Sequence, residues 1–396
     1  MGKKQMLFNP LPAVVIGGPP HSGKSVLAYS LSQALRERGV GHYLLRAYPP
    51  DGEGDWTFAP AQETVRPWRV KGSVSTRWIA LLRRDLQQRQ LPLLVDFGGL
   101  PTPEQETLLD VCTHSLLLSP DEASAEEWRA RLARHGLIPL AELQSSRKGT
   151  EAIWRHSPVL CGTMVGLERG QQASGSVFVA LVRLLEALFQ PWQGLRSQHL
   201  QSAPPEADLV LDLDQLARTL QLAPLAWQPE DLPQVLDYLP GGQSLALYGR
   251  APDWLYGALA ALARPARCFM FDPRRGWLQA PRLQRGPTSA EAFWTSALRQ
   301  ATPAYLVWHL TLPDTYLDPE AVNGATVALP EMTRGVILSG KSPLWLWLGI
   351  IPLCSAPWLA LAQPQLAGSV VIASQDPTYP VGRVLSGVPA VPAAEA

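Results

Sequence analysis

The chain has 396 residues, and its 34 basic side chains balance its 34 acidic ones, so the formal net charge is zero. Proteins that bind long nucleic acids non-specifically need a large excess of Lys and Arg, which this sequence lacks. Hydrophobic residues make up 46% of the chain and charged residues 17%, a composition typical of folded domains and not of disordered segments. The length predicts two or three globular domains, and the charge balance leaves room for a local basic pocket that binds one small anion.

The first 195 residues alternate between apolar runs of strand length and helical patterns. Strands are expected at residues 13–16, 42–45, 93–95, 115–118 and 137–141, and helices at residues 25–37 and 177–189. Thr102 and Ser124 are the expected N-caps of two further helices, because Gln105 and Glu127 follow them at the spacing of a capping box. This alternation predicts an α/β domain with a mostly parallel sheet, followed by a Pro-rich linker at residues 190–207.

Residues 18–25 carry the pattern GxxxxGK[ST], which follows the first expected strand and opens the first expected helix. In this context glycines let backbone N–H groups surround a phosphate, and the helix N-terminus adds its dipole. Lys24 is expected to contact the β- and γ-phosphates of ATP, and Ser25 to ligate Mg²⁺. The predicted nucleotide-binding residues of this P-loop are Gly18, His21, Ser22, Gly23, Lys24 and Ser25.

A carboxylate for the same site is predicted at Asp96, which ends the apolar strand 93–95. Ligands gather at the carboxyl ends of parallel strands, so Asp96 is the expected second Mg²⁺ ligand and, with Lys24, an expected catalytic residue. An Asp that only starts a turn is the alternative. The acidic, Gly-rich loop 48–56 either contacts the nucleotide or acceptor or is a surface turn. Hydrolysis of ATP and phosphoryl transfer to a small acceptor both fit these parts, so an ATPase and a kinase-like enzyme are both open.

The second half of the sequence contains an internal repeat with a constant offset of 91 residues. Residues 249–256 (GRAPDWLY) align without a gap with residues 340–347 (GKSPLWLW). Each copy has the pattern of a strand, a Gly-basic-x-Pro-x-Trp turn, an apolar helix and a second apolar strand. The sequence therefore predicts a P-loop domain followed by two tandem small α+β domains, with the boundaries 1–195, 206–298 and 302–396.

No segment is expected to cross a membrane. Residues 343–366 carry no charge, but four prolines interrupt them, so they are predicted to be buried core. The four cysteines are scattered and form neither a zinc-binding nor a disulfide pattern, which favours a reducing, cytoplasmic location.

The second repeat resembles a known protein family. Its turn reads Ser339-Gly340-Lys341-Ser342-Pro343-Leu344-Trp345, and the later segment 368–374 reads GSVVIAS. These are similar to the Ser-Gly-Arg-Gly-Pro-x-Trp and Val-Val-x-x-Ser-His motifs of the CRISPR-associated ring nucleases called Csx-three. Some members of that family are fused to an N-terminal P-loop domain, the layout expected here. The resemblance is clear over residues 302–390 and weaker over 206–298.

The resemblance implies binding of cyclic tetra-adenylate, the second messenger of type III CRISPR antiviral defence, between stacked subunits of a homo-oligomer. It also implies ring cleavage supported by Mn²⁺. A turn with a hydroxyl and one fixed cation suits a phosphate, although a strand-to-helix turn whose Trp only packs has the same pattern. The residues that would bind the ring are Gly249, Arg250, Ser339, Gly340 and Lys341.

The sequence departs from the family where catalysis would occur. The family reads Asp-Pro-Arg, but the second repeat has Gln363-Pro364-Gln365, and only the first repeat keeps Asp272 and Arg274. Glutamine is a poor ligand for a hard cation, so the second repeat is predicted to bind the ring without cutting it. Asp272 and Arg274 are the predicted catalytic residues, with no general base assigned; the alternative for Asp272 is the start of a turn.

Three functions follow as hypotheses. The leading one is a type III CRISPR accessory protein that binds cyclic tetra-adenylate and either degrades it or senses it to control the P-loop domain. The alternative is a small-molecule kinase or ATPase whose C-terminal half only regulates or oligomerises. The third is an interaction scaffold with a vestigial nucleotide site.

Overall fold

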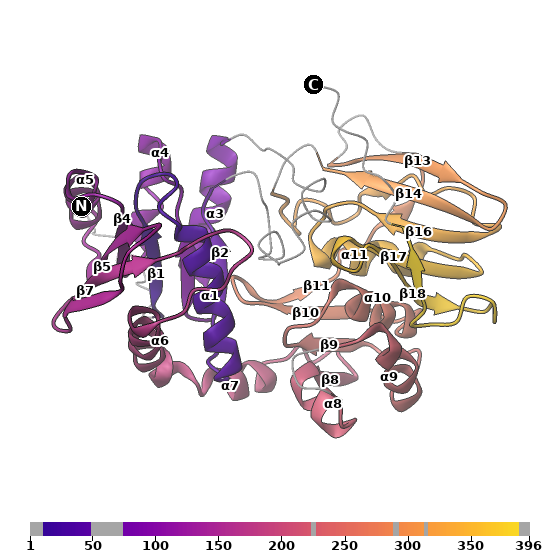
Figure 1. The fold of residues 1–396 in the computed structure, drawn as a ribbon. Helices are drawn as coiled ribbons and strands as arrows, with labels where there is room; N and C mark the ends of the chain where they lie inside the picture. The colour runs from indigo at the N-terminus through magenta and orange to yellow at the C-terminus, as the bar shows by residue number, and fades with distance from the viewer. Residues whose placement is uncertain (1–10, 49–73, 223–226, 288–292, 313–315, 388–396) are drawn as a thin grey trace, which may run out of the picture. The chain divides into compact units, whose positions relative to one another are not determined.

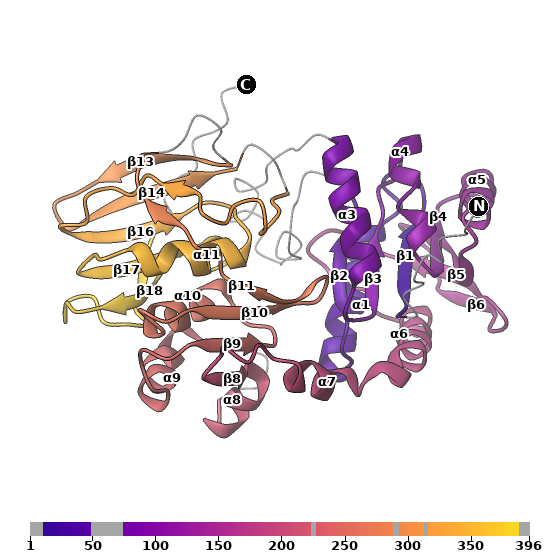
Figure 2. The same ribbon diagram turned by 180° about the vertical axis from the view of Figure 1, so that it is seen from behind.

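The computed structural model describes residues 11–48, 74–222, 227–287, 293–312 and 316–387, and Figures 1 and 2 draw the ribbon from two sides. The chain divides into two compact units. Among the described residues, the first unit comprises 11–48, 74–198 and Pro273–Gly276, and the second unit comprises His199–Asp272 and the described residues from 277 to 387.

The first unit is built on a seven-stranded sheet in the order β2-β3-β1-β4-β5-β7-β6. All neighbouring strands run parallel except β6 and β7, which confirms the predicted mostly parallel α/β sheet. The strands are β1 Ala13–Gly17, β2 Tyr43–Arg46, β3 Leu93–Asp96, β4 His114–Ser119, β5 Ile138–Ser146, β6 Ala152–Arg155 and β7 Leu160–Val165.

Helices cover both faces of this sheet, because alternate residues of a buried strand point to opposite sides. Val14 and Ile16 of β1 share a core with α1 and α6. On the other face, Trp128 of α5 packs so closely on β1 that a side chain at Gly17 would begin 3.0 Å from the ring. Figures 1 and 2 show α1 and α3 on opposite faces. The helices are α1 Lys24–Glu37, α3 Thr76–Gln88, α4 Pro103–Glu106, α5 Glu122–Arg134 and α6 Ser176–Phe189, with 3₁₀ turns η3 Leu109–Val111 and η4 Gln190–Trp192.

One local prediction for the first half was wrong. The N-cap of α5 is Asp121 and not Ser124, because the Asp121 carboxylate accepts a hydrogen bond from the Ser124 backbone N–H at 2.8 Å and starts the helix earlier. The predicted linker 190–207 contains the division between the two units, between Gln198 and His199, and it includes η4 and the helix α7 Leu195–Gln201. The strands β6 and β7 were not predicted.

The second unit contains two larger sheets and a short two-stranded one. The four-stranded sheet has the order β11-β10-β9-β8, and the six-stranded sheet has the order β13-β14-β16-β17-β18-β19. The strands are β8 Leu209–Asp212, β9 Leu245–Tyr248, β10 Cys268–Asp272, β11 Gly276–Gln279, β12 Gln284–Arg285, β13 Thr295–Ala301, β14 Tyr305–Thr311, β15 Thr326–Val327, β16 Gly335–Ser339, β17 Trp358–Gln363, β18 Gly368–Ser374 and β19 Val384–Ser386. The helices are α8 Leu213–Thr219, α9 Leu232–Tyr238, α10 Asp253–Leu262 and α11 Leu344–Ile350, with 3₁₀ turns η5 Pro229–Asp231, η6 Ile351–Leu353 and η7 Pro364–Leu366.

The repeat seen in the sequence has a structural counterpart. Strand β9, helix α10 and strand β10 follow one another at the same spacing as β16, α11 and β17. One hydrophobic core joins residues of both copies. Gly257 of α10 leaves so little room that a side chain there would begin 3.1 Å from Ile351 and Ile372. The two copies therefore fold around a shared core within a single unit.

The uncharged segment 343–366 forms α11, η6 and β17, and most of its side chains are buried in that core, as predicted. In the described part of the chain, no helix has the length and apolar character needed to span a membrane.

Candidate functional site

The first candidate site is the loop between β1 and α1, which carries the predicted phosphate-binding residues. Gly18 has φ +146°, and a Cβ there would lie 1.9 Å from the Leu118 carbonyl oxygen. Gly23 has φ +91°, and a Cβ there would lie 2.6 Å from Leu167. Both positions therefore accept only glycine, for reasons of backbone conformation and of space. The loop returns the chain to α1, whose first two residues are Lys24 and Ser25.

Lys24 bends back over this loop. Its ammonium group donates a hydrogen bond to the Pro19 carbonyl oxygen at 2.6 Å and lies 3.5 Å from the Ser22 hydroxyl. Burial lowers the pKa of Lys24 to about 8, and the nearby Asp96 opposes that shift. A desolvated cation enclosed by a glycine loop is an arrangement that attracts an anion, because phosphate oxygens would replace the water that the ammonium has lost.

Asp96 lies beside this loop because β3 pairs with β1 in parallel, with Asp96 opposite Ile16. Its side chain is buried, and this desolvation raises the pKa of the carboxyl group against the opposing effects of Arg46, Ser25, Lys24 and Tyr48. One carboxylate oxygen, Oδ1, has no hydrogen-bond partner among the described residues. The structure thus brings Lys24, Ser25 and Asp96 together, and leaves one buried carboxylate oxygen available to a ligand.

Tyr48 also belongs to this site, although the sequence pointed to it only as the first residue of the acidic loop 48–56. Its hydroxyl donates to Asp96 Oδ2 at 3.2 Å and lies 3.1 Å from the Ser25 hydroxyl. The rest of that loop is outside the described residues. Its position in the sequence could have indicated this role, because Tyr48 follows β2 and therefore lies at the same edge of the sheet as Asp96.

The second candidate site consists of two matching turns in the second unit. The Gly249 turn (residues 248–251) begins at the last residue of β9, and the Gly340 turn (residues 339–342) begins at the last residue of β16. Their glycines have φ +117° and +131°, and a proline, Pro252 or Pro343, caps the helix that comes next. A Cβ at Gly340 would lie 2.2 Å from the Leu310 carbonyl oxygen, whereas a Cβ at Gly249 would lie 3.4 Å from its nearest neighbour, the Cβ of Leu213. The Gly340 turn is the tighter of the two.

The Gly340 turn presents hydroxyl groups and one cation. Lys341 is half-buried, and the Oγ atom of Ser342 is buried without a hydrogen-bond partner among the described residues. Ser339 is buried, and its hydroxyl lies 3.1 Å from His309 Nδ1. His309, on the neighbouring strand β14, was missed because it belongs to no sequence motif. This turn offers hydrogen-bond donors and a positive charge in one place.

The surroundings of the Gly249 turn are acidic instead. Arg250 is exposed, and Tyr256 of α10 donates a hydrogen bond to the Gly249 carbonyl oxygen at 2.6 Å. Burial raises the pKa of Tyr256, and the negative charges of Asp214, Asp253 and Asp272 raise it further. The residues aligned with Asp253 and Asp272 in the second repeat are the uncharged Leu344 and Gln363. An anion is therefore better accommodated at the Gly340 turn.

Arg274 lies in the segment Pro273–Gly276, which groups with the first unit. It is buried, and its Nε atom lies 3.8 Å from Asp85 Oδ2. Arg275 Nε lies 2.8 Å from Asp85 Oδ1, and the Arg274 guanidinium is 5.9 Å from the ring centre of Tyr43. These contacts give Arg274 a structural role that was not predicted from the sequence.

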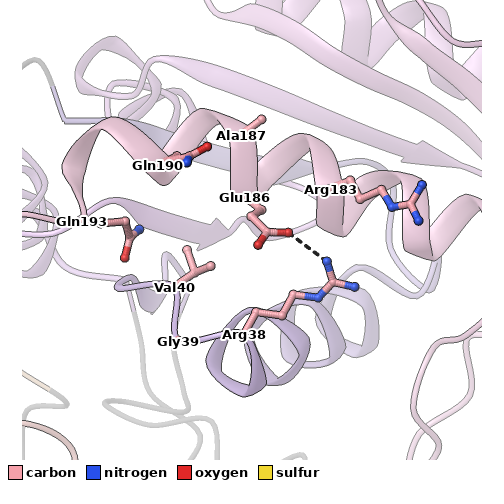
Figure 3. A pocket seen from close by; sticks show the side chains of 8 residues that line it. All are labelled: Arg38, Gly39, Val40, Arg183, Glu186, Ala187, Gln190 and Gln193. Carbon is pink, nitrogen blue, oxygen red and sulfur yellow. Dashed lines mark hydrogen bonds and ion pairs between the residues drawn. The ribbon is translucent and has the colours of Figure 1, made fainter.

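One cavity, of about 480 Å³, lies away from the predicted site residues (Figure 3). It is at the C-terminal end of α1, where Arg38 and Glu186 of α6 form an ion pair at 2.8 Å. The predicted phosphate-binding loop is at the other end of the same helix, about 21 Å away at a rise of 1.5 Å per residue. The cavity is therefore separate from the predicted nucleotide site.

Comparison with known proteins matches only the C-terminal part of the chain. Residues 310–386 match the model of a family described as CRISPR-associated protein (Cas_csx3). The match contains the Gly340 turn and supports a domain of this type at the C-terminus. No curated protein matches the chain.

Proposed function

We propose that the second unit binds cyclic tetra-adenylate at the Gly340 turn, as part of a CRISPR-associated function. The observation that carries this proposal is the family match over residues 310–386, which includes the whole turn. The physical features of the turn agree with it. Gly340 permits close backbone approach, Lys341 supplies a cation, and the Ser342 hydroxyl lacks a partner among the described residues. A phosphodiester oxygen would satisfy both the cation and the hydroxyl.

Ring cleavage is the second part of the proposal, and we assign it to Asp272 of the first repeat. Cleavage requires a 2′-hydroxyl or water to form a bond to phosphorus while the bond to the 5′-oxygen breaks. The attacking oxygen loses a proton and the departing oxygen gains one. Asp272 is buried at the end of β10, where a carboxylate could orient the attacking group. No cluster of three or more metal-ligating side chains is found among the described residues, so the described surroundings of Asp272 do not fit an Mn²⁺ site.

For the first unit we propose binding of ATP with Mg²⁺. Lys24 would contact the β- and γ-phosphates, and Ser25 and Asp96 would hold the ion. The chemistry of these groups fits, because Asp96 Oδ1 is a buried oxygen without a hydrogen-bond partner among the described residues. When bound, Mg²⁺ neutralises charge on the phosphates. Lys24 then stabilises the charge that develops as the terminal phosphoryl group leaves, either to water or to a small acceptor.

A small-molecule kinase or ATPase with a regulatory C-terminal half is the rival function. The convergence of Lys24, Ser25 and Asp96 favours it, because that site needs nothing from the second unit. ATP turnover that is independent of the cyclic nucleotide would support this rival.

The test uses the full-length protein and labelled cyclic tetra-adenylate. Calorimetry should detect binding of the ring, with linear tetra-adenylate as the control for charge and base composition. Separation of products, with and without Mg²⁺-ATP, then distinguishes a nuclease from a sensor. If the wild type binds no cyclic tetra-adenylate under either condition, the proposed function of the second unit is wrong.

A further inference from the structure

At both turns, a histidine is hydrogen-bonded to the hydroxyl residue that comes directly before the turn glycine. Ser339 Oγ lies 3.1 Å from His309 Nδ1, and Tyr248 Oη lies 3.1 Å from His199 Nδ1. The two histidines are not separated by the repeat offset of 91, and they lie on different elements, β14 and α7. The same pairing therefore occurs at both turns, with histidines that are not aligned in the repeat.

The pair in the second repeat is fixed by the sheet itself. Strands β14 and β16 run parallel with His309 directly opposite Ser339. Both residues are buried, and Ser339 is the only hydrogen-bond partner of the His309 ring among the described residues. Burial lowers the pKa of His309, and Arg299 acts in the same direction. The imidazole is therefore neutral at neutral pH, with one N–H donor and one acceptor nitrogen.

The position of the single imidazole proton decides what Ser339 can do. If Nδ1 lacks the proton, the serine O–H donates to it, and the serine presents only lone pairs to a ligand. If Nδ1 carries the proton, it donates to Ser339 Oγ, and the serine O–H is free to donate to an oxygen of the ligand. An anion such as a phosphodiester selects the second arrangement, because lone pairs facing an anion repel it.

We propose that His309 is a positioning residue of the anion-binding turn, which holds the Ser339 hydroxyl as a donor to a phosphodiester oxygen. The inference rests on the proposed binding of cyclic tetra-adenylate and places the phosphate contact in the second repeat. Ser339, the Gly340 backbone and Lys341 then form one donor set, and His309 completes it from the neighbouring strand.

The corresponding pair in the first repeat is structural. The His199 ring lies 4.3 Å from the ring of Phe271, centre to centre, and Trp277 Nε1 donates to the His199 carbonyl oxygen at 2.8 Å. The strand position opposite Tyr248, which His309 occupies in the second repeat, is taken by Asp212. That carboxylate accepts a hydrogen bond from Gln215 N and caps α8. His199 is therefore a matched control, in the same kind of hydrogen bond but without the anion-binding role.

The experiment compares His309→Ala, His309→Asn, Ser339→Ala and His199→Asn in the full-length protein, with cyclic tetra-adenylate as the ligand. The asparagine amide N–H replaces the Nδ1 donor. We expect His309→Ala and Ser339→Ala each to weaken binding about tenfold or more, and the double variant to be no weaker than either, since they remove one contact. His309→Asn should recover most of the affinity, and His199→Asn should leave it unchanged. Nitrogen NMR of the wild type with ligand should show the proton on Nδ1.

Wild-type affinity in a folded His309→Ala protein overturns the inference and leaves the proposed function standing. The same follows if His309→Asn binds as weakly as His309→Ala, or if the bound His309 carries its proton on Nε2. Absence of ring binding by the wild type overturns both. If His309→Ala does not fold, as circular dichroism would show, the asparagine variant and the NMR measurement decide the question.

Discussion

The Tyr48 hydroxyl donates a hydrogen bond to Asp96 Oδ2 at 3.2 Å and lies 3.1 Å from the hydroxyl of Ser25. Tyr48 therefore connects the two groups that are proposed to hold Mg²⁺. Because this hydrogen bond favours the ionised carboxylate, Tyr48 partly offsets the effect of burial, which raises the pKa of Asp96.

The first prediction concerns Asp96. Asp96→Asn should abolish Mg²⁺-dependent ATP turnover, because an amide is uncharged and ligates Mg²⁺ poorly. Tyr48→Phe should have a milder effect: the concentration of Mg²⁺ needed for half-maximal turnover should rise several-fold, since Asp96 loses a bond that favours its charged form. Steady-state ATPase assays over a Mg²⁺ series measure both. Asp237→Asn, at an exposed position of α9, is the control for loss of one charge. Turnover by Asp96→Asn at the wild-type level would remove Asp96 from the site.

The second prediction concerns Lys24 as a phosphate contact. Lys24→Ala should abolish ATP turnover in a folded protein, because the β- and γ-phosphates lose their point cation. Lys148→Ala, which removes an exposed lysine of the same unit, should turn over ATP like the wild type. If Lys24→Ala turns over ATP at the wild-type rate, the proposal that the first unit binds ATP at this loop is wrong.

The third prediction concerns Lys24 and stability without ligand. Its pKa is about 8 in the folded protein against 10.5 for the free side chain, so the unfolded chain binds more protons between these values. The contribution of this group to the free energy of unfolding therefore rises with pH from about 8 to 10.5. At pH 7, Lys24→Met should be more stable than the wild type by about 3 kcal/mol. Urea unfolding should show this advantage shrinking as the pH rises above 8; a difference that does not change with pH would contradict desolvation of the Lys24 ammonium as its cause.

Parts of this architecture could be predicted from the sequence because they depend on local pattern. The five strands expected in the first half were continuous apolar runs, and each was found. Strand β6 was not predicted because its apolar run, AIW, is only three residues long, and the strand is largely exposed. Strand β7 was not predicted because Gly162 and Thr163 interrupt its run of apolar residues.

Two contacts that could not be predicted depend on pairing between distant segments: that of Tyr48, named in the sequence only as the first residue of the loop 48–56, and that of His309, which was missed. Tyr48 reaches Asp96 across 48 positions, and His309 reaches Ser339 across 30. Both contacts arise because parallel strands end at the same sheet edge, and strand register could not be predicted from one sequence. The loop between β1 and α1 could be predicted, because its motif lies within eight consecutive positions; the role of Lys24 in it stays a prediction.

The fourth prediction concerns the cations of the two turns. Lys341→Ala should weaken binding of cyclic tetra-adenylate by about ten- to hundredfold, the worth of a partly desolvated charge-assisted hydrogen bond. Arg250→Ala should act in the same direction but less, because Arg250 is exposed and the first repeat places carboxylates near its turn. Arg218→Ala, another exposed arginine of the second unit, is the control. If Arg250→Ala loses more affinity for cyclic tetra-adenylate than Lys341→Ala does, the main binding site of the ring lies in the first repeat and not in the second.

The last prediction concerns cleavage. Asp272 is buried at the end of β10, and its charge acts on Tyr256, which hydrogen-bonds the turn at Gly249. Asp272→Asn keeps the shape and the turn-forming hydrogen bonds of the side chain but removes the charge that could orient an attacking hydroxyl. If Asp272 is catalytic, this variant should bind labelled cyclic tetra-adenylate like the wild type and form linear products at least about a hundredfold more slowly. Product separation over time measures the rate, calorimetry measures binding, and Asp237→Asn again controls for charge. Linear products at the wild-type rate would make Asp272 a structural residue that starts a turn. A wild type that binds the ring without cutting it would make the second unit a sensor, because the second repeat already has Gln363 in the place of this carboxylate.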